Sequence, residues 1–210
     1  AVDKAEAEAD KAFAINRDGA AAVAAAAQRL GVPLIHLSTD YVYDGAKPSP
    51  YVESDATGPL GVYGQSKLAG ELAVRAACPG ALILRTSWVY SPFGANFVKT
   101  MLRIGADRGM VRVVDDQTGS PTSALDIADA ILRLAPGLAN EEGGIHHLAG
   151  TGHVTWCGFA RHIFDVSRRL GGPHPAVEAI ATADYPTLAR RPRYSWLSTA
   201  SFKNSFGFAL

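Results

Sequence analysis

The stretch PLIHLSTDYVYDG at residues 33–45 decides the fold. Its first half, PLIHLS, is a short and nearly continuous apolar run, which is typical of a strand buried on both faces of a parallel sheet. Its polar continuation, Ser38-Thr39-Asp40, therefore comes at the carboxyl end of that strand. Ligands of open parallel sheets bind beyond the carboxyl ends of the strands, so this segment is the first candidate site.

On both sides of this strand, helical and extended patterns alternate. The Ala-rich segment from Asp3 to Leu30 predicts one helix, with Asp3 and Glu6 resembling a capping box at its start and Gly31 ending it. Further helices are expected at 61–78, 96–108, 123–134 and 155–170, and strands at 81–87, 111–114 and 145–148. This alternation predicts βαβ units, and the short connections favour one sheet.

We therefore predict an α/β fold, a Rossmann-like doubly wound parallel sheet with a smaller substrate domain. Residues 1–120 are expected to hold most of the dinucleotide-binding part and residues 121–210 most of the substrate part, with interleaved boundaries. The loops at 38–45, 86–96 and 115–122 follow strands, so the chemistry is expected there.

Composition excludes several classes of protein. Among 210 residues, Lys plus Arg and Asp plus Glu are balanced at 20 each, and without a basic block neither nucleic acid nor an anionic membrane surface is an expected partner. The longest near-apolar runs, such as residues 20–27, are shorter than the ~20 residues of a spanning helix. Two cysteines and 48% hydrophobic residues favour a reduced, cytoplasmic setting without disulfides.

Two glycine patterns resemble phosphate-binding turns, and one group of histidines and a cysteine resembles a metal site. The glycines within 58–64 have no strand before them, and those within 150–152 have no third glycine in register, so neither predicts a phosphate turn. The set of His and Cys within 153–162 lacks a C-x-x-C, and the neighbours His146 and His147 would point to opposite faces of a strand. No metal site is expected.

Tyr63 and Lys67 lie one turn apart in the helical stretch GVYGQSKLAGELAVRAA (61–77), which places both side chains on one face. A tyrosine titrates near 10, and a cation ~4 Å away in a partly dried cleft supplies about 4 kcal/mol, enough to bring the pKa toward neutrality. The similar pair Tyr43 and Lys47 falls in a turn and need not share a face.

Thr39 completes the candidate constellation from the end of the first strand. Its hydroxyl can donate a hydrogen bond to a substrate carbonyl beside the Tyr63 hydroxyl, which gives two donors on one oxygen. Taken alone, Thr39 is equally consistent with a hydroxyl that stabilises a turn, and Tyr63 and Lys67 with two residues on the surface of a helix. A threonine at a strand end combined with this helical pair is far more specific for an active site than either feature alone.

A Ser/Thr at a strand end followed by a helical Tyr-x-x-x-Lys resembles the extended short-chain dehydrogenase/reductases. Within them the chain resembles the dTDP-4-dehydrorhamnose reductase family, in order, from about Val2 to Phe208. Six stretches carry this resemblance: STDYVYDG (38–45), VYGQSKLAGE (62–71), LRTSWVY (84–90), NFVKTM (96–101), VVDDQTGSPT (113–122) and ARRPRYS (189–195).

The resemblance implies reduction of the 4-keto group of dTDP-4-dehydro-L-rhamnose by NADPH or NADH. Tyr63 would give a proton to the C4 oxygen, Lys67 would lower the pKa of Tyr63 and hold the nicotinamide ribose, and Thr39 would bind the same oxygen. The other residues implied to line the cofactor are Leu37, Ser38, Thr86 and Ser87.

Residues that would bind the nucleotide sugar follow from the same resemblance. Asp40 and Trp88 match positions that contact the sugar. Asn96 stands where a helix begins, and free N–H groups there suit a diphosphate. Arg190 and Arg191 could supply bidentate charge to it, with solvated loop arginines as the equally weighted alternative.

Other functions remain open at this stage. Tyr41 stands where resembling sugar 4,6-dehydratases carry a Glu for elimination, so carbonyl reduction is the simpler chemistry. A non-catalytic regulatory subunit of the same family and a nucleotide-sugar epimerase are the alternatives. The sequence leaves open NADH against NADPH, a homodimer and a requirement for Mg²⁺, whose ligands it does not place.

The family's opening strand and Gly-rich phosphate turn would lie upstream of Ala1. We therefore interpret the chain as a fragment. A polypeptide of only these residues is expected to bind dinucleotide poorly and to show no NAD(P)H turnover.

Overall fold

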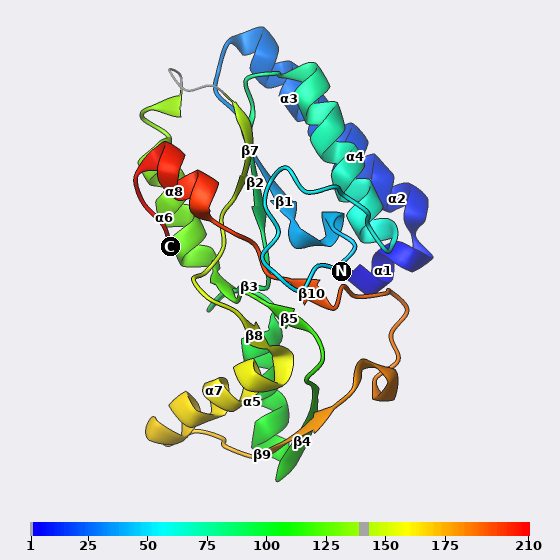
Figure 1. Cartoon of the computed structure of the whole chain (residues 1–210), viewed down its shortest axis with the longest axis vertical. Helices are drawn as coiled ribbons and strands as arrows, with labels where there is room; N and C mark the ends of the chain where they lie inside the picture. The colour runs from blue at the N-terminus through cyan, green and yellow to red at the C-terminus, as the bar shows by residue number, and fades with distance from the viewer. Residues whose placement is uncertain (1, 139–142) are drawn as a thin grey trace.

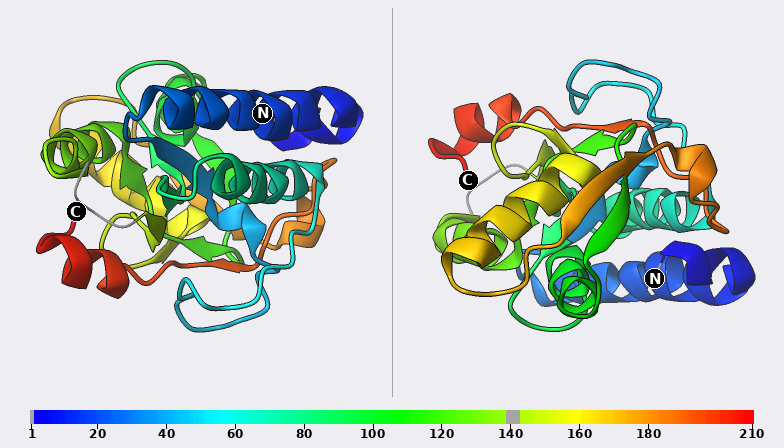
Figure 2. Two further views of the ribbon diagram at one scale, coloured as in Figure 1. Left: turned by 90° about the horizontal axis from the view of Figure 1, so that it is seen from above. Right: turned by 90° about the horizontal axis from the view of Figure 1, so that it is seen from below.

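A computed structural model describes residues 2–138 and 143–210 and confirms the α/β class. Its central sheet is parallel, with strands in the order β1 (Ile35–Thr39), β2 (Leu82–Thr86) and β7 (Gly144–His147). Helices cover both faces of this sheet (Figures 1 and 2). One layer contains α3 (Ala20–Leu30) and α4 (Val62–Ala77), and the other contains α6 (Ala124–Leu134) and α8 (Ala200–Phe206).

Successive side chains of β2 point to opposite faces of the sheet, so this strand contributes to a hydrophobic core on each side. Leu82 and Leu84 pack with Phe202 and the apolar face of α6, whereas Ile83 packs with Ala24 and Val74 on the opposite layer. All five residues of β2 are buried, as expected for a strand covered on both faces. In β1, however, Leu37 is 42% exposed, so the expected burial on both faces is wrong, because β1 lies at one edge of the described sheet.

The predicted N-terminal helix is broken into four pieces: α1 (Val2–Ala7), α2 (Ala9–Phe13), the π-helix η1 (Ala14–Gly19) and α3. The π-turn lies against α4, where a Cβ on Gly70 would be 2.1 Å from the Asn16 carbonyl oxygen. The predicted capping box is also wrong, because Asp3 lies inside α1. Glu6 instead accepts a hydrogen bond from the Val62 N–H at the start of α4 (2.8 Å). Gly31 ends α3 in the left-handed conformation, as predicted.

A lower lobe has its own small sheet and core (Figure 1). In it, β4 (Met110–Val114) pairs in parallel with β9 (Ala176–Ile180), and α5 (Phe97–Asp107) and α7 (Trp156–Arg169) pack beside them. The expectation of a single sheet is therefore wrong for β4. Burial alternates along most of β4, because only one of its faces covers the core of this lobe.

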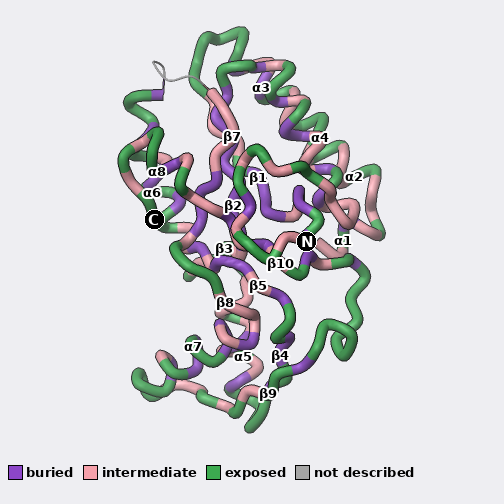
Figure 3. Tube along the Cα trace, in the orientation of Figure 1, coloured by how far each residue is buried: buried purple, intermediate pink, exposed green. Residues whose placement is uncertain are grey.

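The remaining elements are short. They are η2 (Asp40–Val42), β3 (Val89–Tyr90), β5 (Thr118–Gly119), β6 (Thr122–Ser123), β8 (Val154–Thr155), η4 (Thr182–Asp184) and β10 (Tyr194–Ser195). Buried residues run along β2 and gather around β3, β5 and β10, between the lobes (Figure 3). The junction of the lobes is thus a packed region.

The predicted division at residue 120 remains a prediction. β7, from the later stretch, lies in the central sheet, and β4, from the earlier one, lies in the lower lobe. Ala1 and residues 139–142, which fall within the two predicted ranges, lie outside the described residues. Among the helices that are described, none is long and apolar enough to cross a membrane.

Candidate active site

Thr39 lies at the carboxyl end of β1, directly beside Thr86 at the end of β2. The strand turns there into η2, and the Thr39 hydroxyl caps this turn by accepting a hydrogen bond from the Tyr41 N–H (3.2 Å). The same hydroxyl donates to Oδ1 of Asp40 (3.0 Å). Thr39, Asp40 and Thr86 are all buried, so the polar end of the two strands is largely shielded from water.

Tyr63, in the first turn of α4, meets this strand end. Its ring packs edge-on against Tyr41, with 5.5 Å between the ring centroids. Burial raises the pKa of Tyr63, and a negative charge on Asp40 raises it too, whereas hydrogen bonding with the Thr39 side chain lowers it. The side chains of Thr39 and Tyr63 therefore lie close enough to interact.

Lys67 lies one turn further along α4 and points back to the strand. Its ammonium donates a hydrogen bond to the Leu37 carbonyl oxygen (2.7 Å). Burial lowers the pKa of Lys67, and the charge of Glu71 opposes this. The expected lowering of the Tyr63 pKa by Lys67 is not found, because the ammonium is held at the Leu37 carbonyl and the pKa of Tyr63 is raised overall.

Two polar atoms beside Thr39 are buried without hydrogen-bond partners in the described structure: Oδ2 of Asp40 and Oγ1 of Thr86. Leaving such an atom unpaired costs about 1–3 kcal/mol. Burial raises the pKa of Asp40 to about 7, against the lowering effect of the Ser195 and Thr39 hydroxyls. The carboxyl group is therefore poised between its neutral and charged forms, and both atoms suit a polar ligand.

The other predicted cofactor residues divide into two groups. Ser38 donates to Oε1 of Glu71 (2.5 Å), and Ser87 donates to the Ser120 carbonyl oxygen (2.9 Å). Their hydroxyls are thus engaged inside the protein. Leu37, by contrast, offers an exposed apolar side chain at the edge of the sheet.

Trp88 is held in an unusual backbone conformation, with φ of 47°. Its indole N–H donates to the Ser195 hydroxyl (3.1 Å), and its ring stacks on Trp156 with 3.4 Å between centroids. A Cβ on Gly119 would lie 2.4 Å from this indole. Left-handed backbone at a non-glycine residue costs about 1–3 kcal/mol, and such residues cluster at active sites and ligand clamps.

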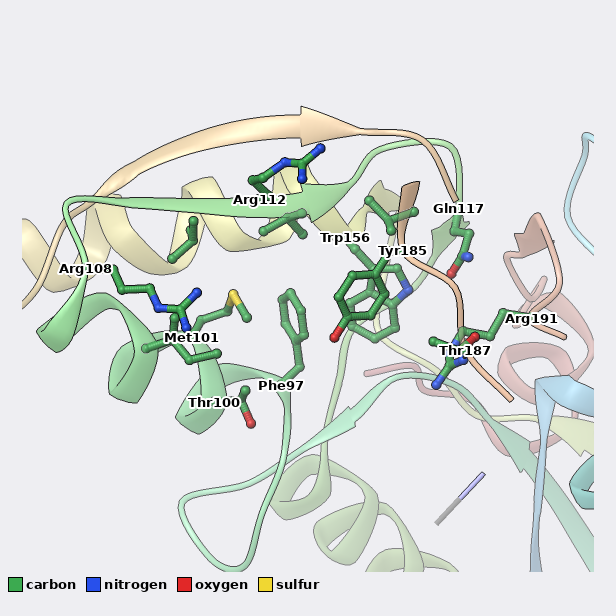
Figure 4. A pocket seen from close by; sticks show the side chains of 14 residues that line it. Phe97, Thr100, Met101, Arg108, Arg112, Gln117, Trp156, Tyr185, Thr187 and Arg191 are labelled. Atoms are coloured by element: carbon green, nitrogen blue, oxygen red, sulfur yellow. Dashed lines mark hydrogen bonds between the residues drawn. The ribbon is translucent and has the colours of Figure 1, made fainter. Parts of the chain in front are cut away.

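A cavity of about 520 Å³ opens beside Trp156 in the lower lobe. The rings of Phe97, Tyr185 and Trp156 gather in its middle, with Arg108 at one end and Arg191 at the other (Figure 4). Of these five, only Arg191 was predicted. The others come from α5, its C-terminal end, α7 and the loop after η4, which are distant in sequence, so no local motif could group them.

The predicted diphosphate residues are differently placed. Asn96 caps α5 by accepting from the Lys99 N–H (3.2 Å) and donates to the Ser91 carbonyl oxygen (2.6 Å), so both ends of its carboxamide are engaged. Arg191 lines the cavity and pairs with Asp3 (2.7 Å). Arg190 is exposed. Residues 2–138 and 143–210 contain no cluster of three or more His, Cys, Asp or Glu that could hold a metal ion.

A parallel α/β sheet with Thr, Tyr and Lys gathered at its carboxyl edge defines the class of short-chain dehydrogenase/reductases. Residues 1–210 match the family described as RmlD substrate binding domain. The chain is 52% identical over 214 residues to the dTDP-4-dehydrorhamnose reductase of Sinorhizobium fredii, covering 100% of this chain and 72% of the relative. It is 44% identical to the dTDP-4-dehydrorhamnose reductase of Escherichia coli K12, covering 100% of this chain and 72% of that relative. The chain belongs to the dTDP-4-dehydrorhamnose reductase (RmlD) family.

Solved structures agree with this assignment. The chain superposes on the dTDP-4-dehydrorhamnose reductase of Bacillus anthracis, crystallised in complex with NADP, with a TM-score of 0.91 and 39% identity, covering 98% of this chain and 71% of that one. The dTDP-glucose 4,6-dehydratase DesIV of Streptomyces venezuelae, at 21% identity and a TM-score of 0.79, shares the fold.

Proposed function

We propose that this chain carries the site that reduces the 4-keto group of dTDP-4-dehydro-L-rhamnose, giving dTDP-L-rhamnose. The observation that carries the proposal is the meeting of Thr39 with Tyr63 at the carboxyl end of β1, with Lys67 one turn behind. The names of relatives that are 44–52% identical support the choice of substrate.

In this proposal Tyr63 is the proton donor. Its phenol is protonated at neutral pH, as an ordinary tyrosine is, and the raised pKa leaves it in this state, which a proton donor needs. As negative charge develops on the C4 oxygen, the phenol proton moves to that oxygen. The Thr39 hydroxyl, which donates to Oδ1 of Asp40 in the structure, would turn to donate a second hydrogen bond to the same oxygen. Burial around the two hydroxyls excludes water and strengthens both interactions.

NADPH or NADH would lie along the exposed edge of β1. The apolar side chain of Leu37 and the unpartnered hydroxyl of Thr86 fit such a ligand, and Lys67 would turn its ammonium to the ribose. Ser38 and Ser87 would not contact the dinucleotide through their hydroxyls, which stabilise the strand ends by hydrogen bonds inside the protein. When bound, the dinucleotide supplies the hydride for C4.

The nucleotide sugar would extend from Tyr63 into the lower lobe. Asp40 and Trp88 would contact the sugar, and the aromatic cavity beside Trp156 would take the flat pyrimidine base. Arg191, with Arg190 and the N-terminus of α5 at Asn96, would face the diphosphate. This arrangement gives each part of the substrate a surface of matching chemistry.

The test uses the longest natural polypeptide that contains this chain, incubated with dTDP-4-dehydrorhamnose and either NADPH or NADH. We expect one equivalent of dinucleotide to be oxidised for each dTDP-rhamnose seen by NMR. Binding of the nucleotide sugar without oxidation would point to a non-catalytic subunit. An inverted sugar without net oxidation would point to an epimerase, and either result would overturn the proposal.

A further inference from the structure

Glu71, on α4, is almost completely buried, with 1% exposure, and both of its carboxylate oxygens are hydrogen bonded. Oε1 accepts from the Ser38 hydroxyl (2.5 Å) and from Nε of Arg85 (2.9 Å), while Oε2 accepts from Nη2 of Arg85 (2.6 Å). The bidentate pairing with Arg85 compensates its charge inside the protein. One helix residue is thereby fixed to both β1 and β2.

The hydrogen bonds of Glu71 with Ser38 and Arg85 form a clamp between α4 and the two strands. Ser38 and Arg85 are each next to a residue of the proposed site. Ser38 and Arg85 are register partners on β1 and β2, and the following pair in register is Thr39 with Thr86. Glu71 itself lies one helical turn after Lys67 on the same face of α4. The clamp therefore fixes the helix that carries Tyr63 and Lys67 relative to the strand ends that they face.

The charge of Glu71 also reaches Lys67. The two side chains form no ion pair in the described structure, but Glu71 is the group that opposes the effect of burial on the pKa of Lys67. From β1, His36 faces both of them, and burial together with Lys67 lowers its pKa to about 4, so it is neutral near pH 7. Glu71 therefore supplies the negative charge near the Lys67 ammonium.

We propose that Glu71 is a positioning residue of the site, which locks α4 to the ends of β1 and β2 and keeps the Lys67 ammonium charged and directed along β1. The proposal rests on the proposed reductase function for the role of Lys67. Its two parts, placement and charge, are separable, because Glu71→Asp keeps the charge and shortens the arm, whereas Glu71→Gln keeps the length and removes the charge.

The test follows Lys67 itself by ¹³C NMR of labelled lysine ε-carbons, with the Lys67 signal assigned by its loss in Lys67→Met. We expect Glu71→Gln to move the titration of Lys67 to lower pH, and Glu71→Asp to leave it near that of the wild type. A matched control is Glu178→Gln, which removes a partner of Arg112 from an exposed pair (3.8 Å) and should not move the Lys67 signal.

Activity gives the second readout, in the longest natural polypeptide containing this chain. A displacement of about 1 Å in a catalytic group costs about 100-fold in rate, so we expect kcat of Glu71→Gln to fall about 10- to 100-fold with little change in KM for the nucleotide sugar. The alkaline limb of its kcat profile should move to lower pH. Glu71→Asp should restore the position of that limb but not the full kcat.

Glu71→Gln leaves Arg85 charged and without its partner in the interior, and this unpaired charge can unfold the protein. The double variant Glu71→Gln, Arg85→Gln removes both charges and should fold, and the titration of its Lys67 should still move to lower pH. An unchanged Lys67 titration in either folded variant, or a wild-type kcat in Glu71→Gln, would overturn the role of Glu71. The NMR result needs no turnover, so it is independent of whether the protein is a reductase.

Discussion

Gly64 lies against the backbone of Tyr41, so closely that a Cβ on Gly64 would be 2.2 Å from the Tyr41 carbonyl oxygen. This contact joins the first turn of α4 to the turn that follows β1. Because Tyr63 immediately precedes Gly64 and Thr39 precedes the turn, the same contact brings the phenol to the threonine hydroxyl. The glycine is therefore part of the construction of the site, although it contacts no substrate.

Gly64→Ala is expected to push α4 away from the strand end. Inserting a methyl group into such a packed contact costs about 1–3 kcal/mol, which urea denaturation would measure. Gly80→Ala is the matched control, because a Cβ there meets nothing within 4 Å. Equal stability of the two variants would contradict the close contact, and an unchanged kcat in Gly64→Ala would contradict its role in placing Tyr63.

Asp40→Asn should become more stable than the wild type as the pH rises from about 4 to about 7. Burial raises the pKa of Asp40 from 3.8 to about 7, so in this range the folded protein holds a proton that the unfolded chain releases. The wild type therefore loses stability with rising pH through this window, by up to roughly 4 kcal/mol, and the variant is spared this loss. The denaturant midpoints of the wild type and of Asp40→Asn, measured at a series of pH values, test this prediction. A difference between the proteins that does not change with pH would refute the assignment.

His147 is predicted to remain neutral, with its proton on Nδ1, down to about pH 4. Nδ1 faces the Ser198 carbonyl oxygen (3.1 Å), which can only accept, while Nε2 faces the Tyr43 hydroxyl (2.7 Å). Burial lowers the pKa of His147 from 6.5 to about 4, so its contribution to stability is lost as the pH falls from 6.5 toward 4. Long-range ¹⁵N–¹H NMR reports the tautomer, and a proton on Nε2 would contradict the hydrogen-bond chain.

Trp156→Ala should weaken the binding of dTDP about 10- to 100-fold, because stacking of a base on an aromatic ring contributes about 1–3 kcal/mol. Trp196→Ala is the matched control, since Trp196 stacks on His153 (3.9 Å) and does not line the cavity. Isothermal titration calorimetry with dTDP measures both. If the two variants bind dTDP equally well, the base lies elsewhere.

Local patterns were enough to predict the strand that ends at Thr39 and the helix that carries Tyr63 and Lys67. The apolar run before Thr39 defines a strand end, and the spacing of Tyr63 and Lys67 places both on one helical face. These relations depend on backbone periodicity, which the sequence carries directly. The packing of Gly64 on Tyr41 then brings the two parts together in space.

Features that depend on distant partners could not be predicted in this way. Pairing of β4 with β9 depends on a strand more than sixty residues later along the chain. The aromatic cavity needs rings from three separate segments. The raised pKa of Tyr63 follows from its burial, which only the packed structure reveals.

The central claim, that the Tyr63 phenol gives its proton to the substrate, is tested most directly by the kcat of Tyr63→Phe beside that of Tyr41→Phe. Tyr41 is a suitable control because its ring packs edge-on against that of Tyr63. Loss of a general acid costs about 100- to 10,000-fold. We predict a loss of that size in Tyr63→Phe with dTDP binding retained, and less than about tenfold in Tyr41→Phe. A Tyr63→Phe variant with a rate near that of the wild type would contradict the account.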